Sequence, residues 1–144
     1  MFLIPQNLNN KRALVTGAGK GIGKACAIAL AEAGADVIII SRTKNDLDRV
    51  QRTIQKLRRK CKTIVCDVSN HLEVEELFSQ IKKLDILVNN AGTNRPKHFT
   101  KVTKKDMDYV IDLNLKAAFN VAQCAVKAML LSKKRKLMGG SIIN

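Results

Sequence analysis

The stretch that decides the fold is Thr16-Gly17-Ala18-Gly19-Lys20-Gly21-Ile22-Gly23, which joins an apolar run to a helical pattern. Glycines here let the backbone turn tightly and approach a pyrophosphate, while the first N–H groups of the helix point at the phosphates. Neither a Walker loop nor the GxGxxG spacing fits, because Gly23-Lys24 is followed by Ala25 and the residue three after Gly19 is Ile22. The remaining pattern, TGxxxGxG, predicts a turn that binds a dinucleotide.

Outward from this loop, short apolar runs alternate with helical patterns along the whole chain. A run such as Val37–Ile40 is too apolar to have one wet face, so we expect strands buried on both sides. Single helices between strands indicate βαβ units with right-handed crossovers. The expected strands are 12–16, 37–40, 63–66, 84–88 and 141–143, and the expected helices are 21–33, 45–57, 72–81 and 104–131. The sequence therefore predicts one α/β domain, a doubly wound parallel sheet with helices on both faces.

The last six residues, 139–144, have the pattern of entry into a fifth buried strand. Chain termini usually lie at the surface, so a strand buried on both faces is not expected to end a chain. We therefore expect residues 1–144 to be an incomplete dinucleotide-binding domain, truncated at the start of the fifth strand.

Composition excludes several classes of protein. A length of 144 residues suits one domain, and 46% hydrophobic residues with two prolines argue against a disordered or linker-rich chain. No run approaches the roughly 18 apolar residues of a membrane span, so we expect no integral membrane protein. The opening residues 1–5 are too short for the apolar region of a signal peptide, which predicts a cytoplasmic protein.

The cysteines and histidines do not form a metal-binding pattern. The four cysteines contain no CxxC pair, and His71 and His98 have no ligand-like spacing to them. We expect reduced thiols that pack as small apolar groups. The four cysteines are Cys26, Cys61, Cys66 and Cys124.

The net charge of +14 raises the possibility of a nucleic-acid partner. The densest basic runs, 56–62 and 133–136, fall where helices are expected to end, and cations are favourable at helix C-termini. None of the five aromatic residues is interleaved with these runs, so no platform for stacking bases is visible. The pattern favours a lysine-rich solvated surface over nucleic-acid binding.

Three further motifs follow the glycine loop in order. Asp67-Val68 comes after the third expected strand, Asn89-Asn90-Ala91-Gly92 after the fourth, and Asn114 lies in the long helix. With TGxxxGxG, these motifs give the chain, from about residue 10 onward, a resemblance to the classical branch of the short-chain dehydrogenase/reductase family. It looks most like the N-terminal part of members such as the 3-oxoacyl-(acyl-carrier-protein) reductases. The resemblance implies a Rossmann fold and a nicotinamide cofactor.

The end of the second expected strand bears on which cofactor is bound. NAD-dependent enzymes usually place an acidic side chain about 20 residues past the glycine loop, but Ile40-Ser41-Arg42-Thr43 offers no carboxylate. Asp46 is assigned instead to the next helix. The Arg42 guanidinium suits a 2′-phosphate, and Lys20 adds a second cation. By resemblance, cations at both places mark members that prefer NADP(H); the alternative is that they are ordinary cations of a basic chain.

The resemblance assigns the remaining cofactor contacts. Asp67 and Val68 would lie beside the adenine ring, and Asn90-Ala91-Gly92 would pass close to a ribose. The cofactor-binding residues expected in all are Gly17, Gly19, Lys20, Gly21, Ile22, Gly23, Ser41, Arg42, Asp67, Val68, Asn90, Ala91 and Gly92.

One catalytic residue is expected in the chain. Asn114 shares a helical face with Val110 and Val121, where a carboxamide needs a hydrogen-bonding partner. In the family that the chain resembles, an asparagine at this place belongs to a group of four with Ser, Tyr and Lys, and helps to hold a water that links the lysine to solvent. The family's YxxxK pair is absent, because Tyr109, the single tyrosine, is followed four residues later by Leu113. The serine would fall beyond residue 144, so we expect these residues alone to be inactive.

The function implied by the resemblance is NADPH-dependent reduction of a carbonyl, such as a 3-oxoacyl thioester or a similar ketone, to an alcohol. Two alternatives stay open: a sugar or polyol dehydrogenase of the same family, and a truncated, non-catalytic nucleotide-binding remnant. The expected partners are a small-molecule or acyl-carrier-bound carbonyl substrate and, for a full-length chain, further copies of itself packed through the helix at 104–131, where small residues permit close contact.

Overall fold

The structure, a computed structural model, describes residues 7–144 except for the side chains of residues 134 and 135. The prediction made from residues 1–5 therefore lies outside the described residues. The same holds for the side chains of residues 134 and 135 in the basic run 133–136. In chain order the elements are β1 (Arg12–Thr16), α1 (Gly21–Glu32), β2 (Asp36–Ser41), α2 (Lys44–Lys56), β3 (Cys61–Val65), α3 (His71–Ser79), β4 (Ile86–Val88), the 3₁₀ turn η1 (Phe99–Lys101), α4 (Lys104–Ile111), the π-helical η2 (Asp112–Ala117), α5 (Ala118–Leu130), α6 (Lys133–Met138) and β5 (Ser141–Ile143).

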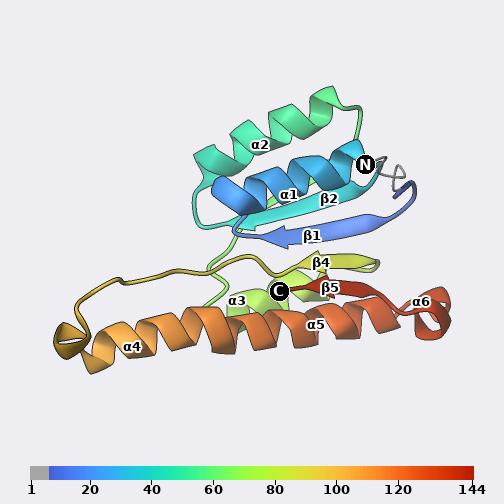
Figure 1. Cartoon of the computed structure of the whole chain (residues 1–144). Helices are drawn as coiled ribbons and strands as arrows, with labels where there is room; N and C mark the ends of the chain where they lie inside the picture. Colours follow the sequence, from blue (N-terminus) through green and yellow to red (C-terminus); the bar gives the residue numbers. More distant parts are fainter. Residues whose placement is uncertain (1–6) are drawn as a thin grey trace, which may run out of the picture.

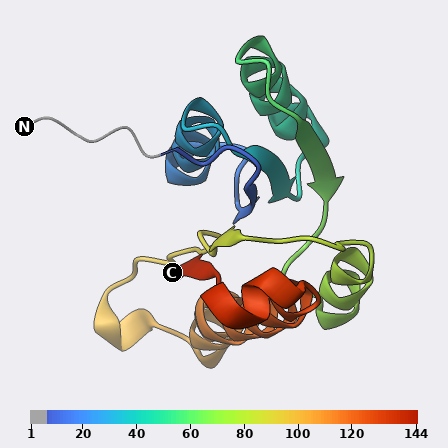
Figure 2. The ribbon, with the colours of Figure 1, turned by 90° about the vertical axis from the view of Figure 1, so that its right-hand side faces the viewer.

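The strands form one parallel sheet in the order β3-β2-β1-β4-β5. Helices α1 and α2 cover one face and α3 and α5 the other, while α4 extends beyond the carboxyl ends of the strands (Figures 1 and 2). This arrangement confirms the predicted doubly wound sheet. The chain moves outward from β1 to β3 and then returns to the other side of β1 for β4. The carboxyl ends of β1 and β4 therefore border the crevice in which such folds bind ligands.

Two apolar cores hold the layers together. One lies between the sheet and the α1–α2 layer, and Val15, Ile39 and Leu47 in it are fully buried. The other lies between the sheet and the α3–α5 layer, around Leu14, Leu87 and Val121. Successive residues of β1 alternate between the two cores, which is why its sequence, Arg12–Thr16, is almost continuously apolar.

The observed elements depart from the prediction in four places, one of which is the fourth strand, which begins at Ile86 rather than residue 84. The third strand begins at Cys61 rather than residue 63. The long helix at 104–131 contains a π-helical turn, η2, between α4 and α5. Helix α6 was not predicted, because its basic run was interpreted as the end of the preceding helix.

The fifth strand is present where it was predicted, at Ser141–Ile143. β5 pairs only with β4 and lies at the edge of the sheet, where Ile142 and Ile143 are exposed to 37% and 56%. The apolar run therefore predicted this strand correctly. Among residues 7–144, no helix is long and apolar enough to cross a membrane.

Candidate nucleotide-binding site

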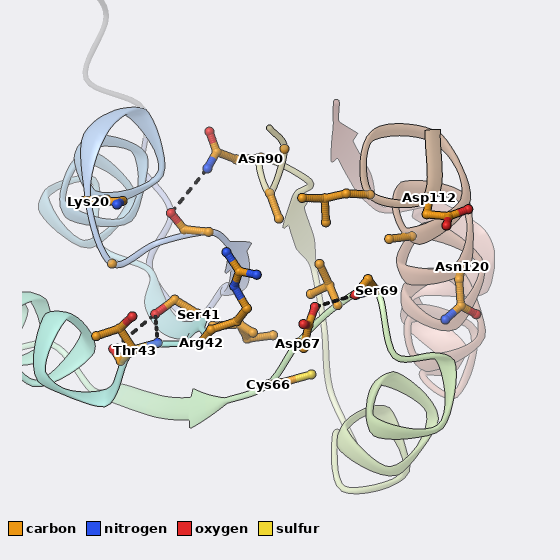
Figure 3. Close-up of a pocket in the computed structure, with 18 of the residues that line it drawn as sticks. Lys20, Ser41, Arg42, Thr43, Cys66, Asp67, Ser69, Asn90, Asp112 and Asn120 are labelled. Carbon is orange, nitrogen blue, oxygen red and sulfur yellow. Dashed lines mark hydrogen bonds between the residues drawn. The ribbon is translucent and has the colours of Figure 1, made fainter. Parts of the chain in front are cut away.

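A groove of about 920 Å³ opens at the carboxyl ends of the strands. The glycine loop and the ends of β2, β3 and β4 form one wall, and the helix that runs through η2 into α5 forms the other (Figure 3). Every residue that was expected to bind the cofactor lines this groove except Gly23, which packs beneath the loop.

The glycine loop is held against the end of β4 too closely for larger residues. A Cβ atom on Gly23 would lie 2.4 Å from both the Gly17 carbonyl oxygen and Asn90 Nδ2. Gly17 has a φ of +64°, and a Cβ there would meet Asn90 Nδ2 at 2.9 Å. The Asn90 amide also donates to the carbonyl oxygens of Thr16 (3.0 Å) and Gly17 (3.4 Å). The loop and the Asn90 turn thus act as one unit.

Helix α1 begins directly after this loop with its end uncapped. The residue before it, Lys20, is extended, and its side chain makes no capping hydrogen bond. The first N–H groups of a helix have no partner within the helix, and the helix dipole adds partial positive charge at this end. With Gly21 and Ile22 lining the groove, this end of α1 can hold a phosphate.

The end of β2 supplies polar and positive groups. Ser41 Oγ exchanges hydrogen bonds with the Thr43 backbone (both 3.3 Å), which shapes the turn into α2. Arg42 and Lys20 are exposed, line the groove, and form no ion pair with any described residue. Sequence reasoning missed Asp46, whose carboxylate also lines the groove and pairs with Arg49 at 3.2 Å. It had been assigned only to the helix that follows.

The end of β3 turns into the groove at Cys66-Asp67-Val68. Asp67 Oδ1 accepts from the Ser69 backbone nitrogen (3.0 Å) and from Ser69 Oγ (2.7 Å), which holds the carboxylate in place. Burial, together with the neighbouring Glu73 carboxylate, raises the pKa of the Cys66 thiol to about 11. Cys66 is therefore a neutral apolar lining group near pH 7.

The Asn89-Asn90-Ala91-Gly92 turn joins three elements at the end of β4. Asn89 Nδ2 donates to the Ala118 carbonyl (2.7 Å) and to Asn144 Oδ1 (3.1 Å), and so connects β4 with α5 and β5. The Ala91 N–H donates to the buried Thr16 hydroxyl (2.9 Å). Hydrogen bonds between segments that are distant in sequence thus hold the end of β4 in place against β1 and α5.

Asn114 occupies a different environment from the one expected. It is exposed and does not line the groove, so the prediction that it shares an apolar face with Val121 is wrong. The π-helical turn changes the helical phase at Asn114 and turns its amide to the loop that follows β4. There Asn114 Oδ1 accepts from the Thr93 N–H and Nδ2 donates to the Thr93 carbonyl, both at 2.8 Å.

A second attachment of this loop is centred on Asp106 of α4. The buried carboxylate accepts from Lys97 Nζ (2.6 Å), from Arg95 (3.4 Å) and from the Thr103 hydroxyl (2.6 Å). It also accepts from the Thr103 N–H (3.1 Å) while the Asp106 N–H donates to Thr103 Oγ1 (3.2 Å), and these two bonds form a capping box. The hydrogen bond from Lys97 is the main cause that holds the pKa of Asp106 well below its usual range. Arg95 also lies over the Tyr109 ring, 4.0 Å from its centre.

The helical wall of the groove was not predicted from the sequence. These residues were expected to belong to one unbroken helix at 104–131. Only the folded arrangement brings one face of that helix over the ends of the strands. The lining residues missed on this wall are Tyr109, Asp112, Leu113, Lys116, Ala117 and Asn120. Within residues 7–144, no cluster of His, Cys, Asp or Glu could hold a metal ion, and the cysteines are free thiols.

Comparison with known proteins gives a consistent result. The family model described as short chain dehydrogenase matches residues 11–144. Mouse L-xylulose reductase is 37% identical over 137 residues, covering 95% of this chain and 53% of the relative. A 3-oxoacyl-acyl-carrier-protein reductase of Thermotoga maritima is 36% identical over 141 residues, covering 95% and 55%. The crystal structure of NAD⁺-bound xylitol dehydrogenase superposes with a TM-score of 0.85 at 27% identity, covering 94% and 52%. The chain thus spans about half the length of these relatives.

Proposed function

Since the chain belongs to the short-chain dehydrogenase family, a family of oxidoreductases that use NAD or NADP, we propose that it forms the NADP(H)-binding part of a carbonyl reductase. The cofactor, when bound, supplies the hydride. The residues described here bind and orient the cofactor, and the activity of the whole protein is part of the proposal.

The observation that carries the proposal is a pair of cations, one in the glycine loop and one directly after β2, that form no ion pair with any described residue. Lys20 and Arg42 face the same groove, and neither is neutralised by a carboxylate among the described residues. A 2′-phosphate would form charge-assisted hydrogen bonds with the Arg42 guanidinium, and Lys20 would add attraction. NADH brings no phosphate to this place and would leave both cations without a counter-charge.

Asp46 is the one nearby group that opposes this assignment. Its carboxylate lines the groove, but the ion pair with Arg49 at 3.2 Å offsets its charge. An Asp46→Asn substitution should therefore leave NADP(H) preferred over NAD(H) and strengthen NADP(H) binding slightly.

The other groove residues fit the rest of a dinucleotide. The uncapped start of α1 suits the pyrophosphate, Asp67 with Val68 suits the adenine, and Asn90-Ala91-Gly92 suits the ribose next to the nicotinamide. Asn114, the one expected catalytic residue, supports the loop after β4 through Thr93. We propose that its role is to position this loop and, in the complete enzyme, to hold a water near the catalytic lysine.

The substrate class stays a proposal between two candidates. The T. maritima relative favours a 3-oxoacyl thioester presented by an acyl carrier, whereas the mouse relative favours a sugar or polyol. Purified protein assayed with an acyl-carrier-bound 3-ketone and with L-xylulose, each with NADPH, distinguishes them. A cytoplasmic location and assembly through α4 and α5 are proposed with either.

The decisive test of cofactor preference is Arg42→Asp. We expect NADP⁺ affinity to fall by about tenfold to a hundredfold, as for loss of one or two charge-assisted bonds, with little change for NAD⁺. Isothermal calorimetry measures both on the same preparation. An unchanged ratio of the two affinities would show that Arg42 does not read a 2′-phosphate.

The catalytic part of the proposal needs a separate measurement. The intact mass of the native protein, together with its full coding sequence, shows whether a serine and a YxxxK pair accompany these residues. Their presence with NADPH-dependent turnover supports a reductase. Nucleotide binding without them supports a non-catalytic remnant.

A further inference from the structure

One buried side-chain donor at the groove, Nδ2 of Asn120, has no hydrogen-bonding partner among the described residues. Asp112, Lys116 and Asn120 follow one another at intervals of four on the helical wall, and all three line the groove. Lys116 Nζ pairs with Asp112 Oδ1 at 2.7 Å. Asn120 forms no comparable contact: its Nδ2 is closed to solvent and has no hydrogen-bonding partner among the described residues.

A buried donor without an acceptor is destabilising, so its presence requires an explanation. Asn120 is 9% exposed and is one of the residues that line the groove. Its other amide atom, Oδ1, makes only a long contact with the Cys124 thiol at 3.8 Å. The terminal torsion of asparagine is broad, so the amide can turn its nitrogen into the groove at little cost.

A free acceptor lies on the opposite wall. Both hydrogen bonds to the Asp67 carboxylate use Oδ1, and Oδ2 bonds to no described residue. In Figure 3, the Asn120 nitrogen lies on the side of the amide that faces Cys66, Asp67 and Ser69. The two walls thus present an acceptor and a donor to whatever lies between them.

We propose, on the basis of the NADP(H) function above, that Asn120 recognises the adenine base together with Asp67. The edge of adenine carries a donor, the N6 amino group, beside an acceptor, N1. Asp67 accepts from the amino group, and Asn120 donates to N1 directly or through one water. A 6-oxopurine has a carbonyl acceptor in place of the amino group and an N1–H donor in place of N1. Its carbonyl would therefore face the Asp67 carboxylate, and its N1–H would face the Asn120 donor.

The first test is Asn120→Leu, which keeps the volume and removes the donor. We expect NADP⁺ affinity to fall about tenfold, the effect of one buried hydrogen bond. Because the variant also removes an unsatisfied buried amide, the melting temperature without ligand should stay the same or rise. Gln123→Leu makes the same chemical change on the exposed side of α5 and should alter neither value. A fall in both affinity and unliganded melting temperature would mean that Asn120 only supports packing, and would overturn the inference.

The second test changes the base instead of the protein. Nicotinamide hypoxanthine dinucleotide phosphate carries a 6-oxopurine, so Asn120→Leu should weaken it much less than it weakens NADP⁺. Equal losses would overturn the assignment to N1. Measuring NAD⁺ as well separates this inference from the proposed function: an NAD-preferring protein contradicts the proposed role of Arg42 but should still show the loss at Asn120. Absence of nucleotide binding by the wild type would contradict both.

Discussion

The two walls of the groove differ in how they are built. The strand wall consists of turns whose backbone is fixed by close packing, as where Gly23 meets the Gly17 carbonyl with no room for a Cβ. The helical wall consists of side chains that project from one face of a helix, among them Lys116 and Asn120. A backbone wall tolerates almost no change in residue size, whereas a side-chain wall can change its chemistry without changing its shape. We therefore expect substitutions at the tightly packed glycines of the strand wall to abolish binding, and substitutions of side chains that project from the helical wall to tune it.

The largest expected effect is that of Gly23→Ala. Its Cβ would approach two fixed atoms to 2.4 Å, so the loop must move away from the Asn90 turn. We expect loss of detectable NADP⁺ binding by calorimetry and a destabilisation of about 1–3 kcal/mol, as for overpacking elsewhere.

Gly21→Ala is the matched control for this substitution. Gly21 has a φ of +56°, but a Cβ there meets no atom within 4 Å, so the variant suffers backbone strain alone. If both variants still bind NADP⁺, close packing at Gly23 is not what makes the strand wall sensitive to substitution.

An intermediate effect is expected at Asp106, which attaches the loop after β4 to α4. Asp106→Asn removes the charge that Lys97 and Arg95 contact, and should lower the melting temperature at neutral pH while leaving NADP⁺ affinity nearly unchanged.

The pH dependence follows from the lowered pKa of Asp106. A folded-state pKa below the unfolded value of about 3.9 means that the carboxylate stabilises the fold above that pH, and that this contribution disappears as pH falls through the folded-state pKa. The difference in melting temperature between wild type and Asp106→Asn should therefore be constant from neutral pH to about pH 5 and narrow below about pH 4. A difference that persists unchanged at the lowest pH would show that the charge is not its cause.

The smallest effect is expected for Asn114→Ala. The variant loses two hydrogen bonds to Thr93 at an exposed site, which should cost about 1 kcal/mol. Hydrogen exchange at the Thr93 amide should become faster, and NADP⁺ affinity should stay close to that of wild type because Asn114 lies outside the groove. A loss of affinity as large as that of Gly23→Ala would place Asn114 within the binding site.

Residues of the strand wall were largely predicted from the sequence, whereas residues of the helical wall were not. The glycine loop, Arg42, Asp67 and Asn90 were identified because each lies at the end of a strand, and parallel strands bring their carboxyl ends to one edge of the sheet. Asn120 and Lys116 have no local signal: a polar residue on a helix is indistinguishable in sequence from any solvated one.

Three features follow from the amino-acid sequence alone: the order of the strands and main helices, the turn that approaches a phosphate, and the absence of a carboxylate at the end of β2. These are local properties, set by apolar runs, by glycine and by side-chain charge. Three other features are visible only in the folded chain. Asp46 lines the groove, and a π-helical turn directs Asn114 to Thr93. Asn120 places an Nδ2 that has no partner among the described residues on the wall opposite Asp67. Each of these features depends on how a helix is rotated relative to the end of a distant strand. Packing across the sheet fixes that rotation, and no local sequence pattern predicts it.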